Sequence, residues 1–260
     1  MTGTLKRYSL YPVLPIGLLL VWYLLTINAK PYGEIPIPGQ VVAAAKDLIA
    51  TGTLFTALLT SIGRVLIGFV FASIVAVIVG LAMGYRRIME EIADPLIESV
   101  RPIAPIALVP LAVLWFGTGT QAAIFIVAYA AFFPMVLNAA AGVRDVDVSL
   151  VRAARTMGAN ELTILRQVIL PAAMPHLLVG ARLAMGAAWT SVVAAELAVG
   201  AKSGAGSTGG IGQLMFSYYL YQPDPNPIVV CMVGVGVVGL AINFVMVWLG
   251  RMLMPWKTDA

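Results

Sequence analysis

The chain has 260 residues, of which 60% are hydrophobic and 11% charged, and its mean hydropathy is +0.94. Soluble domains carry about 25% charged residues, so this composition excludes a soluble globular protein. The net charge of +4 fits a basic membrane face rather than nucleic-acid binding. One cysteine, Cys231, leaves no partner for a disulfide or a thiolate metal cluster. These numbers predict an all-α membrane protein of one domain, residues 1–260.

Six apolar stretches are expected to be transmembrane helices. The first follows Lys6 and Arg7 as a signal peptide would, but it is 18 residues long and no good cleavage site follows it. Between the second and third stretches, the charged segment 85–101 is predicted to be a loop, and the glycine-rich segment 200–212 is predicted to be another. The six expected spans are 10–27, 54–84, 102–116, 121–142, 171–199 and 227–250. The third contains three prolines and should be kinked or broken.

The distribution of lysine and arginine predicts the orientation. Six spans place both termini on one side of the membrane. If that side is the cytoplasm, eleven Lys and Arg residues are inside and three outside, with Arg64 and Arg182 left within spans. Arg101 belongs to the eleven. The bias fits the positive-inside rule, so both termini and the segment 150–171 are predicted to be cytoplasmic.

The segment 150–171 is the longest amphipathic stretch of the chain. Leu150, Ala153, Ala154 and Met157 share one face of a predicted helix. Gly158 should end that helix, because glycine tolerates the left-handed conformation of a C-terminal cap. Asn160 can then cap a second short helix that carries Leu162, Leu165 and Ile169, with Glu161 in its first turn. Two short helices joined at a glycine elbow form a projection that can dock into another protein.

The same segment resembles the EAA loop of ABC-importer permeases. Ala153-Ala154, Gly158 and the Val168-x-Leu170-Pro171 ending have the spacing of that motif. Arg152 stands where the family usually has glutamate, and Val168 replaces an isoleucine. The resemblance implies a cytoplasmic coupling helix that fits a groove on an ATPase subunit. It assigns the coupling role to Arg152, Ala153, Ala154, Met157, Gly158, Leu165, Leu170 and Pro171.

Further motifs resemble the permeases that import nitrate, bicarbonate, cyanate, taurine and aliphatic sulfonates. They include Arg101-Pro102-Ile103-Ala104-Pro105, Leu114-Trp115-Phe116-Gly117 and Ala194-Ala195-Glu196, and the likeness covers about residues 40–255. It implies a type I (MetI-like) importer permease of six helices in the inner membrane. The implied partners are the lipid bilayer, two ATPase subunits, a second permease copy and an external binding protein. ATP and magnesium would be bound by the ATPases, with no cofactor in this chain.

The sequence carries no recognisable catalytic or nucleotide-binding motif. Gly200-Ala201-Lys202-Ser203 lacks the glycine that must directly precede the lysine of a phosphate-binding loop. His176 is the only histidine, which leaves no metal-ligand set and no nucleophile–base pair. We therefore expect a transport subunit that is not itself an enzyme.

Placing a charged side chain at membrane depth costs several kcal/mol of free energy unless it is paired or hydrated, so such residues are usually functional. Arg64 is interpreted either as a member of a structural pair, or as a side chain that snorkels to the outer interface, or as a functional group. Arg182 and Glu196 are 14 residues apart, close to four helical turns, and so fall on nearly the same side of the fifth span. That side either faces a path or a dimer axis, or packs against a neighbouring helix through small residues. The candidate path residues are Arg182, Gly186, Trp189, Thr190, Glu196 and, from the third span, Trp115.

Two other function classes are compatible with part of this pattern. A broken third span would suit a secondary transporter driven by an ion gradient. Such a transporter, however, does not need the docking projection, and the sequence lacks the carboxylates that would couple transport to an ion. A membrane-embedded enzyme or assembly factor is disfavoured, because the sequence shows no recognisable set of catalytic residues. The sequence leaves open which small anion or sulfonate is carried, and whether the two permease copies are identical.

Overall fold

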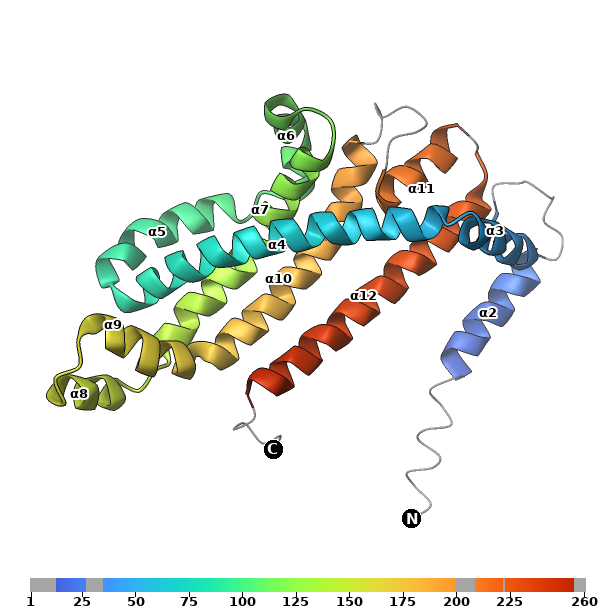
Figure 1. Ribbon diagram of the computed structural model, residues 1–260. Helices are drawn as coiled ribbons and strands as arrows, with labels where there is room; N and C mark the ends of the chain where they lie inside the picture. The colour runs from blue at the N-terminus through green and yellow to red at the C-terminus, as the bar shows by residue number, and fades with distance from the viewer. Residues whose placement is uncertain (1–12, 27–34, 200–208, 222, 255–260) are drawn as a thin grey trace, which may run out of the picture.

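The computed structural model describes residues 13–26, 35–199, 209–221 and 223–254, and these ranges are almost entirely helical (Figure 1). The predicted glycine-rich loop 200–212 falls mostly outside them. In chain order the elements are α2 (Val13–Thr26), α3 (Pro38–Ala50), α4 (Thr53–Tyr85), α5 (Arg87–Val100), η1 (Pro105–Leu108), α6 (Val109–Phe116), α7 (Thr120–Arg144), α8 (Val148–Thr156), α9 (Glu161–Ile164), η2 (Leu165–Ile169), α10 (Leu170–Val199), α11 (Ile211–Leu220) and α12 (Pro225–Leu253).

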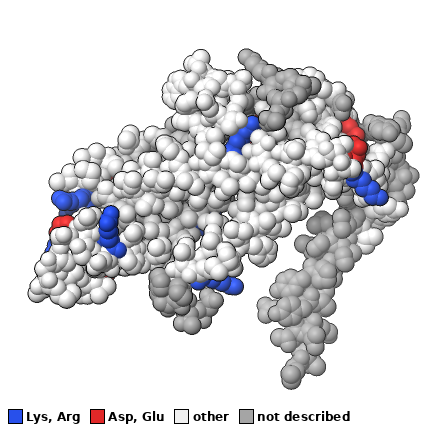
Figure 2. All heavy atoms as spheres, in the orientation of Figure 1, with Lys and Arg blue, Asp and Glu red and all other residues white. Residues whose placement is uncertain are grey.

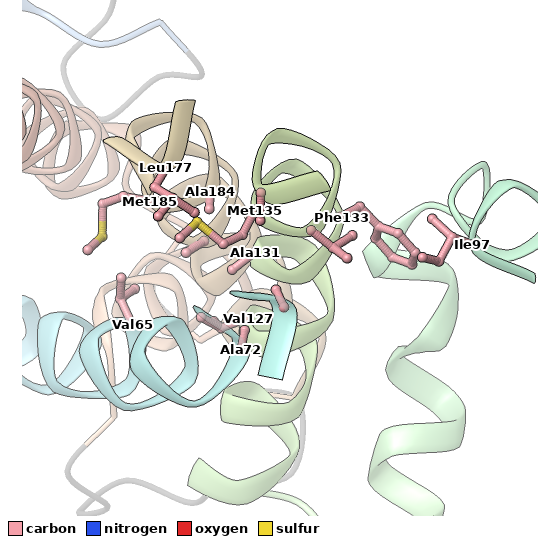
Figure 3. Close-up of a cluster of buried hydrophobic side chains, with 14 of the residues drawn as sticks. Val65, Ala72, Ile97, Val127, Ala131, Phe133, Met135, Leu177, Ala184 and Met185 are labelled. Carbon is pink, nitrogen blue, oxygen red and sulfur yellow. The ribbon is translucent and has the colours of Figure 1, made fainter. Parts of the chain in front are cut away.

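The core of the bundle is the packing of α7 against α4 on one side and α10 on the other. Small residues make this approach close: a Cβ on Gly80 of α4 would lie 2.6 Å from the Cβ of Ala139 on α7. Larger side chains fill the remaining space, among them Val127, Met135 and Met185 (Figure 3). Because lipid offers helices no hydrophobic drive to associate, such close small-residue contacts are the main source of helix packing in a membrane.

Four helical segments are long and apolar enough to cross a membrane. They are α4, α7, the continuous run Glu161–Ala198 and α12, and the bent pair of α5 with 105–116 is a possible fifth. The α2 helix contributes 14 described residues to the predicted first span. The all-helical fold is confirmed, while the described part of the chain yields four or five spans rather than the six expected.

The prediction of a charged loop at 85–101 is wrong, because this segment is mostly the helix α5. It packs beside α4, and its axis makes an angle of 85° with the segment 105–116 that follows. The predicted break near the prolines is present, but it separates α5 from η1. Alternating apolar and charged residues along α5 obscured a helix that is strongly amphipathic.

The two ends of the bundle differ in their short elements. Helices α8 and α9 project at one end, which we call the loop end, and α3 and α11 lie at the other (Figure 1). On the face seen in Figure 2, most charged side chains lie near the helix ends, and one basic side chain shows in the otherwise uncoloured middle. That distribution is what a bilayer crossing the middle of the bundle requires.

Candidate coupling loop and membrane-buried charges

The loop end has the predicted helix–elbow–helix form. Gly158 follows α8 with a φ of 80°, the left-handed region that favours glycine. Asp147 caps α8 by accepting the Ser149 N–H at 2.8 Å, a hydrogen bond that lowers the pKa of its carboxyl. Asn160 caps α9 by accepting the Thr163 N–H at 2.8 Å. The predicted elbow and the predicted Asn160 cap are therefore confirmed.

Only part of this projection is anchored to the bundle. Ala154, Ile164 and Ile169 are buried together with Val143 and Val146. Among the predicted coupling residues Leu165 and Leu170 are half-buried, and the exposed ones are Arg152, Ala153, Met157, Gly158 and Pro171. Met157 is 81% exposed and Leu150 is 52% exposed. The sequence placed these two on the same apolar face as Ala154, yet the structure buries Ala154 and leaves them free, so the projection offers an apolar tip.

A π-helical turn connects the projection to α10. Residues Leu165–Ile169 form it, directly after α9. π-Helical turns are rare and frequently occur at functional sites. Arg155 braces the same region, since its Nη2 lies 3.2 Å from Glu161 Oε1 and 3.3 Å from the Tyr85 hydroxyl of α4. The projection is thereby tied to both α4 and α10, two helices that run through the bundle.

At the opposite end, a buried ion pair joins α4 to α10. Arg64 Nη1 lies 2.7 Å from Glu196 Oε1, and their side chains are 6% and 0% exposed. Arg64 also donates to the Thr120 hydroxyl at the start of α7, at 3.1 Å from Nη2. This bears out the structural-pair interpretation of Arg64. Both charges are recognisable in the sequence, but their pairing is not, because 132 positions separate them.

The same carboxylate receives the N-terminus of α11. Gly212 N–H donates to Glu196 Oε2 at 3.0 Å, and Ile211 N–H donates to the Ser61 hydroxyl at 2.9 Å. Ser61 in turn donates to the carboxylate at 2.8 Å. A negative charge at a helix N-terminus is favourable because it meets unpaired N–H groups and the positive end of the helix dipole. The network of Ser61, Arg64, Thr120, Glu196 and α11, which we call the buried charge network, fastens four helices together.

The predicted path residues of α10 do not share one exposed face. Trp189 is buried and donates to the Val235 carbonyl of α12 at 3.1 Å, and Glu196 faces the buried charge network. Arg182, Gly186 and Thr190 are exposed. The prediction of a continuous stripe is wrong for Trp189 and Glu196, because α12, α4 and α11 cover the side of α10 from which they project. For the other three residues a role in the path stays a prediction.

Trp115 lies in an aromatic cluster at the tip of α6. Its ring centroid is 6.0 Å from that of Phe125 on α7 and 6.4 Å from that of Phe116. Trp115 is nevertheless 60% exposed and Leu114 is 79% exposed. The single chain thus leaves this part of the fold uncovered, and the assignment of Trp115 to the path is not tested by it.

The described residues hold no group of three or more His, Cys, Asp or Glu side chains that could bind a metal ion. His176 lies 2.9 Å from Asp145, which links α10 to the residue that follows α7. The Lys202 segment lies outside the described ranges. The described residues therefore form an exposed projection at one end and a buried charge network at the other, with long helices between them. Such an arrangement can transmit a movement of the projection along the bundle.

Residues 72–259 match the family described as the binding-protein-dependent transport system inner membrane component. This chain belongs to that family. The permease is the transmembrane subunit of an ATP-driven ABC importer, in which ATP hydrolysis takes place in separate subunits. The family description also places it in the inner membrane.

Three relatives of the permease are themselves permeases, and the match covers most of each chain. A putative ABC transporter permease protein of Methanocaldococcus jannaschii is 36% identical over 92% of this chain and 88% of its own. The taurine transport system permease protein TauC of Escherichia coli is 33% identical over 93% and 87% of the two chains. The putative aliphatic sulfonates transport permease protein SsuC of Bacillus subtilis is 30% identical over 98% and 90%.

The fold has a solved counterpart. An inward-facing structure of the MetNI methionine ABC transporter superposes with a TM-score of 0.64 at 20% identity, covering 77% of this chain and 95% of the other. The likeness confirms the predicted type I importer fold.

Proposed function

We propose that this permease imports a small sulfonate or oxyanion. The relatives named for taurine and for aliphatic sulfonates support that substrate class. The observation that carries the proposal is the exposed Arg182 in the middle of α10. A cation at membrane depth is tolerated when it faces water or a counter-ion rather than lipid. A path for anions along the exposed side of α10 meets that requirement.

The exposed tip of the loop end is the surface through which ATP hydrolysis would act. Met157, Leu150 and the exposed side of α8 would enter a groove on an ATPase subunit. Movement of the tip would reach α10 through the π-helical turn and α4 through Arg155. This role makes the loop end cytoplasmic, with both termini on the same side. The permease itself would bind neither ATP nor magnesium.

The assembly that fits this division of labour contains two permeases, two ATPases and an external binding protein. A second identical copy would cover the exposed side of α10 and the uncovered tip of α6, including Trp115. Such a pairing would place one Arg182 from each copy beside the path. The single permease domain would then supply half of the channel wall.

A reconstitution experiment tests the function. The permease is co-produced with its ATPase in proteoliposomes, and uptake of taurine, ethanesulfonate, bicarbonate and nitrate is measured with the cognate binding protein and ATP. We expect ATP-dependent uptake of a sulfonate or an oxyanion, and no ATP hydrolysis by the permease alone. Uptake that persists without ATP and stops when the ion gradient is collapsed would contradict the proposal.

A further inference from the structure

The helix α5 presents three chemically different sides. One side packs into the bundle, where Ile97 meets Phe133 of α7 (Figure 3). The other two are a bare apolar side and a charged side. The packed side is Ala93, Ile97 and Val100, the apolar side is Ile88, Ile92 and Leu96, and the charged side is Asp94, Glu98 and Arg101. Residues at these spacings of three and four share a helix face.

The end of α5 lies deep in the membrane region. The Tyr129 hydroxyl of α7 donates to the carbonyls of Val100 and Ile103, at 2.8 and 3.0 Å. Tyr129 precedes the last residue of α7, Arg144, by fifteen positions (144 minus 129). At 1.5 Å per residue that is roughly 22 Å from the loop end, within a hydrocarbon core of about 30 Å. Arg101 therefore does not belong among the cytoplasmic arginines, where the charge count placed it.

Lipid cannot be the neighbour of the charged side. Helix α4 packs against α5, and the exposed residues in the middle of α4 are apolar, among them Val70, Phe71 and Ile74. Lipid is the neighbour that suits these side chains and the apolar side of α5. The charged side points elsewhere around the helix, and within the described residues no ion pair engages Asp94, Glu98 or Arg101. Uncompensated charges at this depth require water or a charged ligand.

The break after α5 supports the same conclusion. Residues 101–104 are not helical in the regular sense, and all four are exposed. Irregular backbone at membrane depth is tolerated where it is buried in protein or lines a water-filled cavity. Since these residues are not buried in the chain, the break would line water. It also lies near α10, because η1 packs against both α7 and α10.

We propose that Arg101 is a substrate-contacting residue of the translocation path, which runs past the break between α5 and η1. Its guanidinium would donate charge-assisted hydrogen bonds to a sulfonate or oxyanion, with Arg182 of α10 nearer the loop end as a second cation. The inference rests on the proposed function for the sign of the substrate's charge. The placement of Arg101 beside water rests on the fold alone.

The test restores the charge chemically. In the complete complex of permease, ATPase and binding protein, Cys231→Ala removes the native thiol, and Arg101→Cys is added. Taurine uptake into proteoliposomes should fall by about tenfold, the loss expected for one charge-assisted contact. A cationic methanethiosulfonate reagent should then recover most of the uptake, whereas an anionic one should not. Leu96→Cys, on the apolar side of α5, is the matched control and should neither react nor lose uptake.

The outcomes separate the two claims. Three results would overturn the role of Arg101: normal uptake by the Arg101→Cys complex, failure of both reagents to react with it, and loss of assembly. Recovery by both reagents would also overturn it, because bulk and not charge would then matter. If Arg101→Cys reacts but the parent complex takes up no sulfonate or oxyanion, the proposed substrate class fails while the water-lined position of Arg101 stands.

Discussion

Arg64 and Glu196 are 132 positions apart in the chain, yet Nη1 of the arginine lies 2.7 Å from Oε1 of the glutamate. The pair closes the end of the bundle opposite the coupling loop. Its carboxylate also holds the N-terminus of α11, so one side chain joins α10, α4 and α11. Such a pair is costly to bury and more costly to break, because removing one partner strands the other charge.

Single and double substitutions of this pair should differ in a characteristic way. Glu196→Met and Arg64→Met should each destabilise the permease by about 3–5 kcal/mol, whereas the double variant that combines them should lose clearly less than the sum of the two. The measurement is the thermal unfolding midpoint of the purified permease in detergent. Additive losses would show that the two charges do not depend on each other.

The packing around the N-terminus of α11 is tight, so one added methyl group there should lower the stability of the permease. A Cβ on Gly210 would overlap the Glu196 carboxylate, and a Cβ on Gly212 would lie 2.6 Å from the Val193 carbonyl oxygen. We expect Gly210→Ala to lower the unfolding midpoint, because the buried charge network must shift. Gly236→Ala on α12 is the control, since nothing lies within 4 Å of its added Cβ. Equal midpoints for the two variants would contradict this account.

The Gly158 elbow should control coupling rather than folding. At φ 80° a β-branched side chain is strained, whereas asparagine tolerates this region. Gly158→Val should therefore enter the membrane and assemble but lose ATP hydrolysis stimulated by the binding protein, while Gly158→Asn should retain much of it. The measurement is ATPase activity of the reconstituted complex. Normal coupling by Gly158→Val would mean that the elbow conformation is not required.

Arg182 should affect transport without affecting substrate capture. Arg182→Ala removes an exposed cation from α10, so anion uptake should fall by about tenfold, while the affinity of the separate binding protein stays unchanged. Leu183→Ala, one residue along and 54% exposed, is the matched control. Uptake assays and binding titrations measure the two quantities. Wild-type uptake by Arg182→Ala would remove this residue from the path.

The orientation can be read by cysteine labelling after Cys231→Ala. Ser149→Cys, at the loop end, should react with an impermeant thiol reagent only in inverted membranes. Thr51→Cys, in the turn between α3 and α4 at the other end, should react from outside intact cells. The opposite pattern would place the coupling projection beyond the reach of an ATPase.

Local patterns determined the part of the fold that depends on neighbouring residues. The elbow at Gly158 and the Asn160 cap were predicted because φ preference and side-chain capping act over a few positions. Long apolar runs likewise predicted α4, α7, α10 and α12, because a bilayer demands them. The motif spacing of 150–171 indicated the family for the same reason: its residues are close in the chain.

Only the tertiary structure decided which distant groups meet and which sides remain bare. Periodicity placed Glu196 on nearly the same side as Arg182, but α4 and α11 cover Glu196 and pair it with Arg64. The charges in 85–101 indicated a loop, yet this segment is a helix whose Ile97 packs against the core. The Tyr129 hydroxyl of α7 donates to the Val100 carbonyl at the end of that helix, and this contact places the following residue, Arg101, beside α7. Contacts between residues tens of positions apart depend on how the helices pack together. The hydrophobic periodicity of one helix does not show which helix packs against it, so these contacts could not be predicted from the sequence.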